Sequence, residues 1–128
     1  MPKIHWLDKP ETHDYPAAAD YLELIADGET VSGIVDALRG GTVALKKAKD
    51  ILRAARLPLL PADNAHVKSD LQKVGQGKPL SPILLVRGQI SPAIPLQIAD
   101  GYHRVCASYY LDENTDIPVI LATLPGSA

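Results

Sequence analysis

Residues 96–110 read Leu96-Gln-Ile-Ala-Asp-Gly-Tyr-His-Arg-Val-Cys-Ala-Ser-Tyr-Tyr110. This stretch predicts a strand over 96–99, a tight turn at Gly101 and a helix that continues to about Leu111. A turn between a strand end and a helix start presents backbone N–H groups, and the helix dipole adds a positive potential there. The stretch therefore predicts both a βα unit and a place that favours an anion.

The segments on either side extend this unit into a sheet. The apolar run 83–86 predicts a strand that is buried on both faces. Residues 117–121 predict a last strand, placed near a sheet edge because Pro118 cannot donate to a ladder. Upstream, Asp63 or Asn64 is expected to cap a helix whose apolar face carries Val67, Leu71 and Val74.

The N-terminal segment is predicted to be entirely helical. Apolar residues at helical spacing indicate helices starting near Asp14, Val31 and Ala44, the third ending at Ala55. We therefore predict one α+β domain over residues 1–128, with a helical N-terminal portion (1–56) packed on a small sheet formed by residues 57–122.

Composition sets broad limits. Of the 128 residues, 46% are hydrophobic and 22% are charged, which is typical of a globular protein. No apolar run approaches the roughly 18–20 residues that span a bilayer, so we expect no membrane contact and a cytoplasmic location. The single cysteine, Cys106, excludes an internal disulfide and a Cys-rich zinc cluster. The four histidines share no metal-ligand spacing.

Charge is distributed unevenly along the chain. Residues 1–36 carry a net charge of −6, residues 37–87 a net charge of +7, and residues 88–128 a net charge of −3. A basic middle between acidic ends suits an anionic partner, either nucleotide phosphate or nucleic acid. The alternative is that these lysines and arginines simply solvate a helix face.

Two groups of side chains are candidates for holding phosphate. Arg104 offers a guanidinium fork and His103 a further hydrogen bond, next to the Gly101 turn. On the upstream helix, about 100° per residue brings His66, Ser69 and Lys73 to one face, away from the apolar stripe. The alternative is that both groups are ordinary surface residues that bind no ligand.

The sequence resembles the ParB/sulfiredoxin superfamily over about residues 57–122. Gly101-x-x-Arg104-x-x-Ala107 is similar to the G-x-x-R-x-x-A box of the ParB N-terminal domain, and Gly101-x-His103-Arg104 is similar to the G-C-H-R turn of sulfiredoxins. The resemblance implies a small mixed sheet and a turn that, with the upstream helix, grips nucleotide phosphates.

Departures from these families limit what the resemblance implies. Tyr102 stands where sulfiredoxins have their catalytic cysteine, so sulfinic acid reduction is not expected. Tyr102 also stands where ParB proteins have a metal-coordinating glutamate. Asp100 is then the nearby carboxylate that is left as metal ligand or catalytic base, or as a helix cap. Cys106, between Val105 and Ala107, is expected to be a buried small hydrophobe rather than a nucleophile.

We therefore expect a site that binds a nucleoside triphosphate, a purine nucleotide such as ATP, with Mg²⁺ and a hydrolytic or phosphoryl-transfer step left open. Its candidate residues are Gly101, His103, Arg104, His66, Ser69 and Lys73 for the phosphates, and Asp100 for catalysis or metal. The alternatives are a non-enzymatic nucleic-acid-binding module that uses the basic helix 42–56 and a catalytically inactive scaffold.

Overall fold

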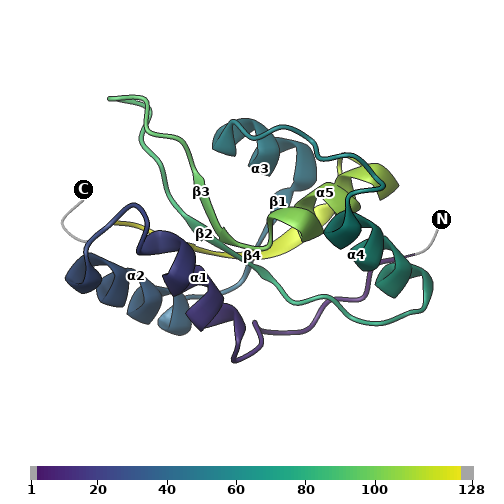
Figure 1. Ribbon diagram of the computed structural model, residues 1–128, viewed down its shortest axis with the longest axis horizontal. Helices are drawn as coiled ribbons and strands as arrows, with labels where there is room; N and C mark the ends of the chain where they lie inside the picture. The colour runs from purple at the N-terminus through teal and green to yellow at the C-terminus, as the bar shows by residue number, and fades with distance from the viewer. Residues whose placement is uncertain (1–2, 125–128) are drawn as a thin grey trace.

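Four strands form one mixed sheet in the computed structural model, which describes residues 3–124 (Figure 1). They are β1 (Ala44–Lys47), β2 (Ile83–Val86), β3 (Gln97–Asp100) and β4 (Asp116–Ala122). Their order across the sheet is β1-β4-β2-β3; β2 and β4 are parallel and the outer two pairs are antiparallel. The predicted α+β class with a mixed sheet is confirmed at this level.

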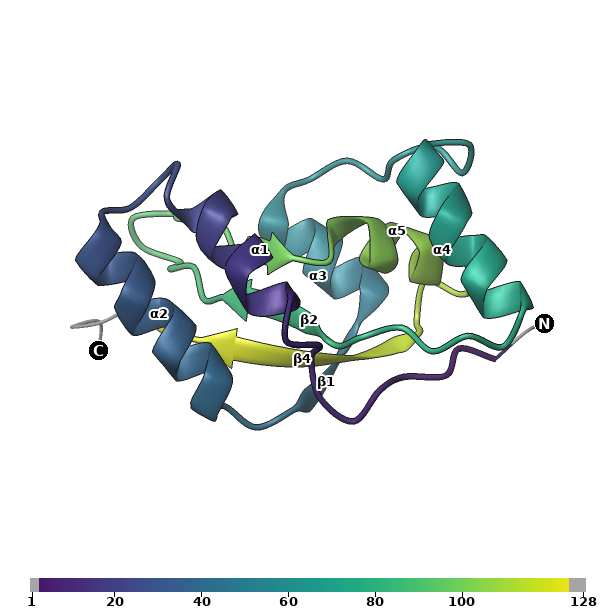
Figure 2. The same ribbon diagram turned by 60° about the horizontal axis from the view of Figure 1, so that its bottom comes forward.

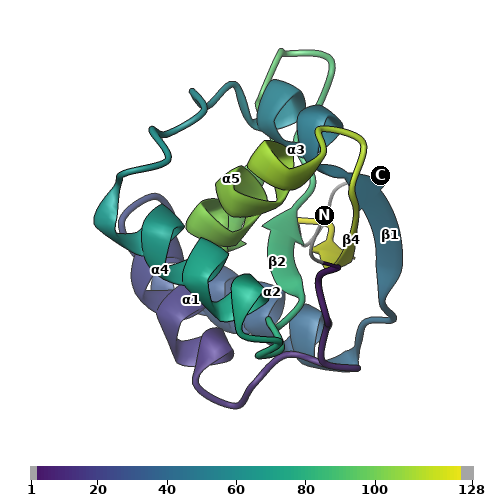
Figure 3. The same cartoon turned by 90° about the vertical axis from the view of Figure 1, so that its right-hand side faces the viewer.

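Helices cover both faces of the sheet (Figures 2 and 3). On one face lie α1 (Asp14–Leu22) and α2 (Gly28–Gly40), and on the other lie α3 (Ala48–Ala55) and α5 (Tyr102–Leu111). The remaining helix in the described part of the chain, α4 (Ala65–Gly75), packs against α5. Within residues 3–124, no helix is both long and apolar enough to cross a membrane.

The buried strand β2 explains why the sheet needs helices on both sides. Leu84 and Val86 pack into the core formed with α1 and α2, whereas Ile83 and Leu85 pack into the core formed with α3 and α5. All four side chains are buried, as the continuous apolar run predicts. Because successive side chains of a strand point to opposite faces of the sheet, the four residues of β2 contribute to both cores.

Residues 44–47 form a strand, so the prediction of a wholly helical portion 1–56 is wrong. Ala44 pairs with Val119 and Lys47 with Asp116 in the antiparallel β1–β4 ladder, and α3 begins only at Ala48. The helical spacing of apolar residues does hold for α1, α2 and α3. Pairing with a strand about 70 residues further along the chain overrides it for residues 44–47.

The edge position predicted for the last strand is also wrong. β4 lies inside the sheet, between β1 and β2. Pairing with β2 begins at Val119, one residue after Pro118, so the proline lies just outside that parallel ladder. A missing N–H is tolerated there because it interrupts no bond between two paired residues of β2 and β4.

The first residues of α4 and α5 are both fixed by local interactions. Asn64 caps α4 with its Oδ1, which accepts hydrogen bonds from the N–H groups of His66 and Val67 at 3.0 and 3.2 Å. Gly101 caps α5 in the left-handed region, with a φ of 114°. These two caps start helices that lie side by side and lead into the same cavity.

Candidate functional site

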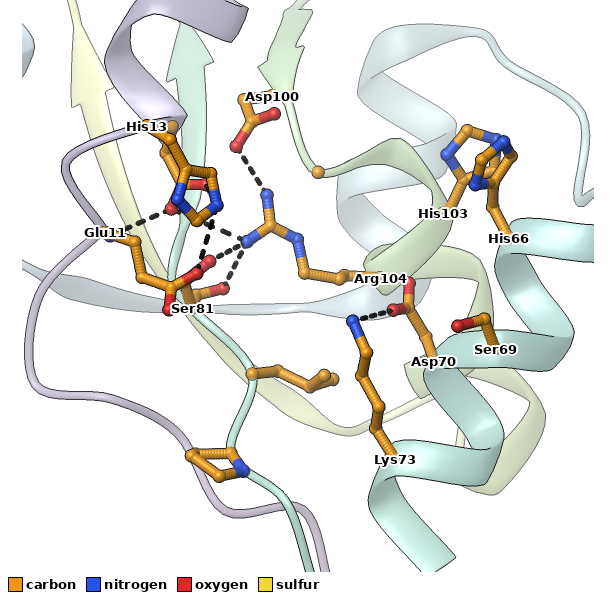
Figure 4. Close-up of a pocket in the computed structure, with 14 residues that line it drawn as sticks. Glu11, His13, His66, Ser69, Asp70, Lys73, Ser81, Asp100, His103 and Arg104 are labelled. Atoms are coloured by element: carbon orange, nitrogen blue, oxygen red, sulfur yellow. Dashed lines mark hydrogen bonds and ion pairs between the residues drawn. The ribbon is translucent and has the colours of Figure 1, made fainter.

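A polar cavity of about 270 Å³ opens between α4, the start of α5, the end of β3 and the segment that precedes α1 (Figure 4). All the site residues predicted from the sequence line this cavity: His66, Ser69, Lys73, Asp100, Gly101, His103 and Arg104. The helical face and the glycine turn, 35 residues apart at Gly101 and His66, are thus brought together by the packing of α4 on α5.

The turn at Gly101 admits only glycine. Its φ of 114° is strained for any residue with a side chain, and an added Cβ atom would lie 2.5 Å from Cδ1 of Ile83. The same Cβ would lie 2.9 Å from Nη2 of Arg104. The backbone therefore passes close to both the core and the guanidinium, which lets α5 start directly under the cavity.

The N-terminus of α5 carries no side-chain cap. The first amide that donates back into the helix is that of Val105, to the carbonyl oxygen of Gly101 at 3.1 Å. The N–H groups of residues 102–104 are the orphan donors of this end, where the helix dipole is positive. The turn thus has the arrangement that binds anions at helix N-termini.

Arg104 is held in place by acidic and polar neighbours. Its Nη2 atom donates to Oδ2 of Asp100 at 2.6 Å, and its Nη1 atom donates to the carbonyl oxygen of Ser81 at 2.9 Å and to the Ser81 hydroxyl. Nη1 also lies 3.9 Å from Oδ2 of Asp14. With 13% of its side chain exposed, the guanidinium is fixed in the cavity wall. Asp100 pairs with Arg104 and does not cap α5, so the capping alternative is wrong.

The α4 wall brings a second set of hydrogen-bonding groups toward the cavity. The rings of His66 and His103 lie 4.7 Å apart between centroids, one from each helix. Nζ of Lys73 lies 3.9 Å from Oδ1 of Asp70, and half of the lysine side chain is exposed. Ser69 lies between these groups along the same face (Figure 4).

Burial shifts the protonation of three groups in the cavity. The pKa of His103 is lowered, first by burial and then by the neighbouring His66, while Asp70 opposes the shift. Burial raises the pKa of Asp70 against the opposing charge of Lys73. Burial likewise raises the pKa of Asp100, although Arg104 opposes it. Each shift disfavours the charged form in the cavity.

Five polar residues that line the cavity were not predicted from the sequence: Glu11, His13, Asp14, Asp70 and Ser81. The first three form a compact group. Nε2 of His13 lies 3.2 Å from Oε2 of Glu11 and 3.4 Å from Oδ1 of Asp14. Their three ligand atoms lie within 4.8 Å of one another, so this group could hold a cation. In the sequence these residues stand together as Glu11-Thr-His-Asp14, but the spacing of the histidines alone does not point to them.

Negatively charged side chains outnumber positively charged ones in the cavity lining. Four carboxylates line it, those of Glu11, Asp14, Asp70 and Asp100, against two permanent cations, Lys73 and Arg104. With neutral histidines the formal charge is −2. The carboxylates gather on the side of α1 and β3, except for Asp70, and His13 lies with them, whereas His66, His103 and Lys73 lie on the α4–α5 side (Figure 4). The cavity therefore has one acidic and one hydrogen-bond-donating wall.

Two residues singled out in the sequence lie outside this cavity. The Tyr102 hydroxyl donates to the carbonyl oxygen of Pro58 and so ties α5 to the connection between α3 and α4. Cys106 is fully buried, as predicted, and burial raises the pKa of its thiol. Neither side chain lines the cavity, so Tyr102 does not take the place of a catalytic cysteine there.

The basic segment 42–56 also lies apart from the cavity. Lys46 and Lys47 belong to β1, and Lys49, Arg53 and Arg56 lie exposed on or just after α3.

No protein-family model, curated protein or solved structure matches this chain. The resemblance to ParB and sulfiredoxins therefore stays a prediction.

Proposed function

We propose that the polar cavity binds the phosphate groups of a nucleoside triphosphate, a purine nucleotide such as ATP, together with a divalent cation. The observation that carries the proposal is the convergence of two phosphate-type elements on one cavity. The uncapped N-terminus of α5 and the His66/Ser69/Lys73 face of α4 both line it. Either element alone is common on protein surfaces, but two such elements that line one cavity are a more specific indication of phosphate binding.

The α4–α5 wall supplies the donors. Lys73 contributes an ammonium that is only loosely paired, since Asp70 lies 3.9 Å away and the lysine side chain is half exposed. The Ser69 hydroxyl and the imidazoles of His66 and His103 add further hydrogen-bond donors. The orphan N–H groups after Gly101 complete this wall.

Arg104 links the two walls. Its guanidinium has five N–H donors, and the contacts to Asp100 and Ser81 use only part of them. Because N–H donors remain free, we assign Arg104 to a phosphate oxygen at the acidic side of the cavity, although Asp100 and Asp14 neutralise much of its charge. The 2.6 Å contact makes Asp100 a positioning residue for Arg104.

A divalent cation accounts for the acidic wall. A bare triphosphate would meet a cavity whose formal charge is already −2, which costs binding energy. Glu11, His13 and Asp14 offer two carboxylates and an imidazole, and Asp100 is the next carboxylate along this wall. A cation held there offsets the charge and neutralises phosphate oxygens.

The cavity volume limits which part of the nucleotide is enclosed. At about 270 Å³ it lies just below the range of roughly 300–1,000 Å³ that is typical of small-molecule sites. The space suits the phosphate chain rather than the whole nucleotide. The nucleoside then lies over the cavity opening, so we expect a modest preference among bases.

The test is a thermal-shift and calorimetric panel of ATP, GTP, CTP and UTP, each with and without Mg²⁺. A nucleotide at 100 times its dissociation constant adds about 2.7 kcal/mol of stability. Lys73→Ala should weaken binding, whereas Lys68→Ala, which removes an exposed lysine of the same helix outside the cavity, should not. Absence of any nucleotide effect, or equal effects of the two variants, refutes the proposal and favours an inactive scaffold.

A further inference from the structure

A second cavity, of about 450 Å³, carries the opposite charge to the first. It lies at the C-terminal end of α3, between this helix, the end of β4 and the loop 87–96 that joins β2 and β3. Its lining includes three arginines, Arg53, Arg56 and Arg87, and no carboxylate. Its apolar lining comes mainly from Ile94, Pro95, Leu96 and Leu121. The lining therefore suits an acidic segment that also presents an aliphatic side chain.

The three guanidiniums have few partners of their own. Nη2 of Arg53 lies 3.7 Å from Oδ1 of Asp50, but the arginine side chain is 87% exposed. Arg56 donates to the carbonyl oxygen of Ala93 at 3.4 Å. No carboxylate in residues 3–124 forms an ion pair with Arg56 or Arg87. Such forks pair best with carboxylates brought by another molecule.

The same chain presents a segment with the matching chemistry. In the turn between α1 and α2, the side chains of Leu24 and Ile25 are 82% and 57% exposed. Glu23 and Glu29 flank them, both exposed and neither in an ion pair within the described chain. Two aliphatic side chains next to free carboxylates match the apolar and arginine lining of the second cavity.

These two surfaces lie at one end of the molecule. The Tyr21 hydroxyl, at the end of α1, donates to Oε1 of Gln97, and Gln97 pairs with Val86, the neighbour of Arg87. Figures 1 and 2 both show the α1–α2 turn and the β2–β3 loop projecting at the same end. The sheet separates them, because α1 and α2 cover one face and α3 the other.

We propose that two copies of this chain associate end to end about a two-fold axis, each inserting its α1–α2 turn into the arginine-lined cavity of the other. A half-turn exchanges the two sides of the sheet, so each acidic turn meets the other copy's arginines. Ile90, which is fully exposed on the loop, belongs to the lining of the arginine-lined cavity and adds an apolar side chain to this end. An apolar centre with charged pairs around it is the usual anatomy of an interface.

A charge exchange tests this pairing. Variant one carries Glu23→Lys and Glu29→Lys; variant two carries Arg53→Glu and Arg87→Glu. All four side chains are exposed, and Arg56, which binds the loop carbonyl, is kept. We expect the wild type to show a dimer mass by sedimentation equilibrium that dissociates with added salt. Each variant alone should be monomeric, and an equimolar mixture should regain the dimer mass, because every contact is then complementary.

Matched controls separate this surface from general charge effects. Lys68→Glu with Lys78→Glu changes the net charge as much, away from both surfaces, and should leave the dimer intact. Leu24→Ser, which removes the aliphatic side chain without adding charge, should weaken the dimer without loss of folding, because Leu24 is exposed. A wild type that stays monomeric at every concentration overturns the proposal. So does a mixture that fails to associate, or an arginine surface that binds a DNA oligonucleotide while the chain stays monomeric. Mg²⁺-nucleotide binding is measured in parallel and tests the other cavity independently.

Discussion

The Nη2 atom of Arg104 donates a 2.6 Å hydrogen bond to Oδ2 of Asp100, across the Gly101 turn that separates the two residues. Because Ser81 and Asp14 hold the other side of the guanidinium, its position is set by the fold. A fixed donor loses little conformational freedom when a ligand binds. The same carboxylates reduce its effective charge, so Arg104 acts through geometry as much as through charge.

Arg104→Ala should weaken Mg²⁺-nucleotide binding tenfold to a hundredfold, since one charge-assisted contact of about 1.5–3 kcal/mol is lost. Arg104→Lys should recover only part, because an ammonium keeps the charge but not the fork. His66→Ala should cost less than Arg104→Ala. Titration calorimetry measures all three, with circular dichroism to confirm folding. A folded Arg104→Ala protein with wild-type affinity would falsify this role.

Asp70→Asn should tighten nucleotide binding, because it removes one negative charge from a cavity whose formal charge is −2. It should also change stability in a pH-dependent way. Burial raises the pKa of Asp70 above 3.8, so the wild-type protein loses stability as pH rises through 3.8 to the raised value. The variant lacks that loss. Denaturant titrations below and above this range measure the difference, and parallel curves for the two proteins contradict the prediction.

Nucleotide affinity should rise as pH falls, through His103. Burial and the neighbouring His66 lower its pKa in the free protein, and a bound phosphate raises it, so binding takes up a proton. Affinity then increases as pH falls from the bound pKa to the free pKa and is flat outside that window. Calorimetry in buffers of different ionisation enthalpy counts the proton. His103→Gln should abolish the uptake and His5→Gln, outside the cavity, should preserve it; the reverse pattern assigns the proton elsewhere.

Gly101→Ala should destabilise the fold by about 1–3 kcal/mol, from left-handed strain and overpacking against Ile83. The same Cβ displaces the Arg104 guanidinium, so nucleotide binding should weaken as well. Gly75→Ala is the matched control, because nothing lies within 4 Å of its added Cβ. Chemical denaturation measures both. Equal stabilities of the two variants would show that the turn tolerates a side chain.

Cys106→Ser should lower the free energy of unfolding by about 1–3 kcal/mol, because a hydroxyl replaces a fully buried sulfur. Nucleotide binding should be unchanged, since Cys106 does not line the cavity. The native thiol should react slowly with Ellman's reagent, because burial both raises its pKa and blocks access. Rapid modification with loss of binding contradicts this assignment.

Local signals explain which parts of the fold could be predicted. The run 83–86, the cap at Asn64 and the turn at Gly101 each depend on a few adjacent residues, and all three form as expected. The strand 44–47 and the interior position of β4 depend on partners far along the chain. Periodicity carries no information about such partners, so the helix predicted over residues 44–47 and the edge position predicted for β4 were both wrong.

The candidate site divides in the same way. The α4 face follows from 3.6-residue periodicity and the α5 end from the glycine turn, so their residues could be identified. The acidic wall comes from the segment 11–14, which reaches Arg104 only through tertiary packing. Asp70 was missed because it follows Ser69 directly, next to the apolar stripe. Only the fold reveals that four carboxylates surround one guanidinium and one ammonium.

The edge strand β1 has a consequence for solubility. All four of its side chains are exposed, and one long side of its backbone faces away from β4. A bare strand of this kind is a template for adding strands from other molecules, which leads to aggregation. Lys46 and Lys47 occupy this strand, and stacking further chains against it would bring ammonium groups together or strip them of water. Part of the basic charge in the middle of the sequence thus protects the sheet from growing.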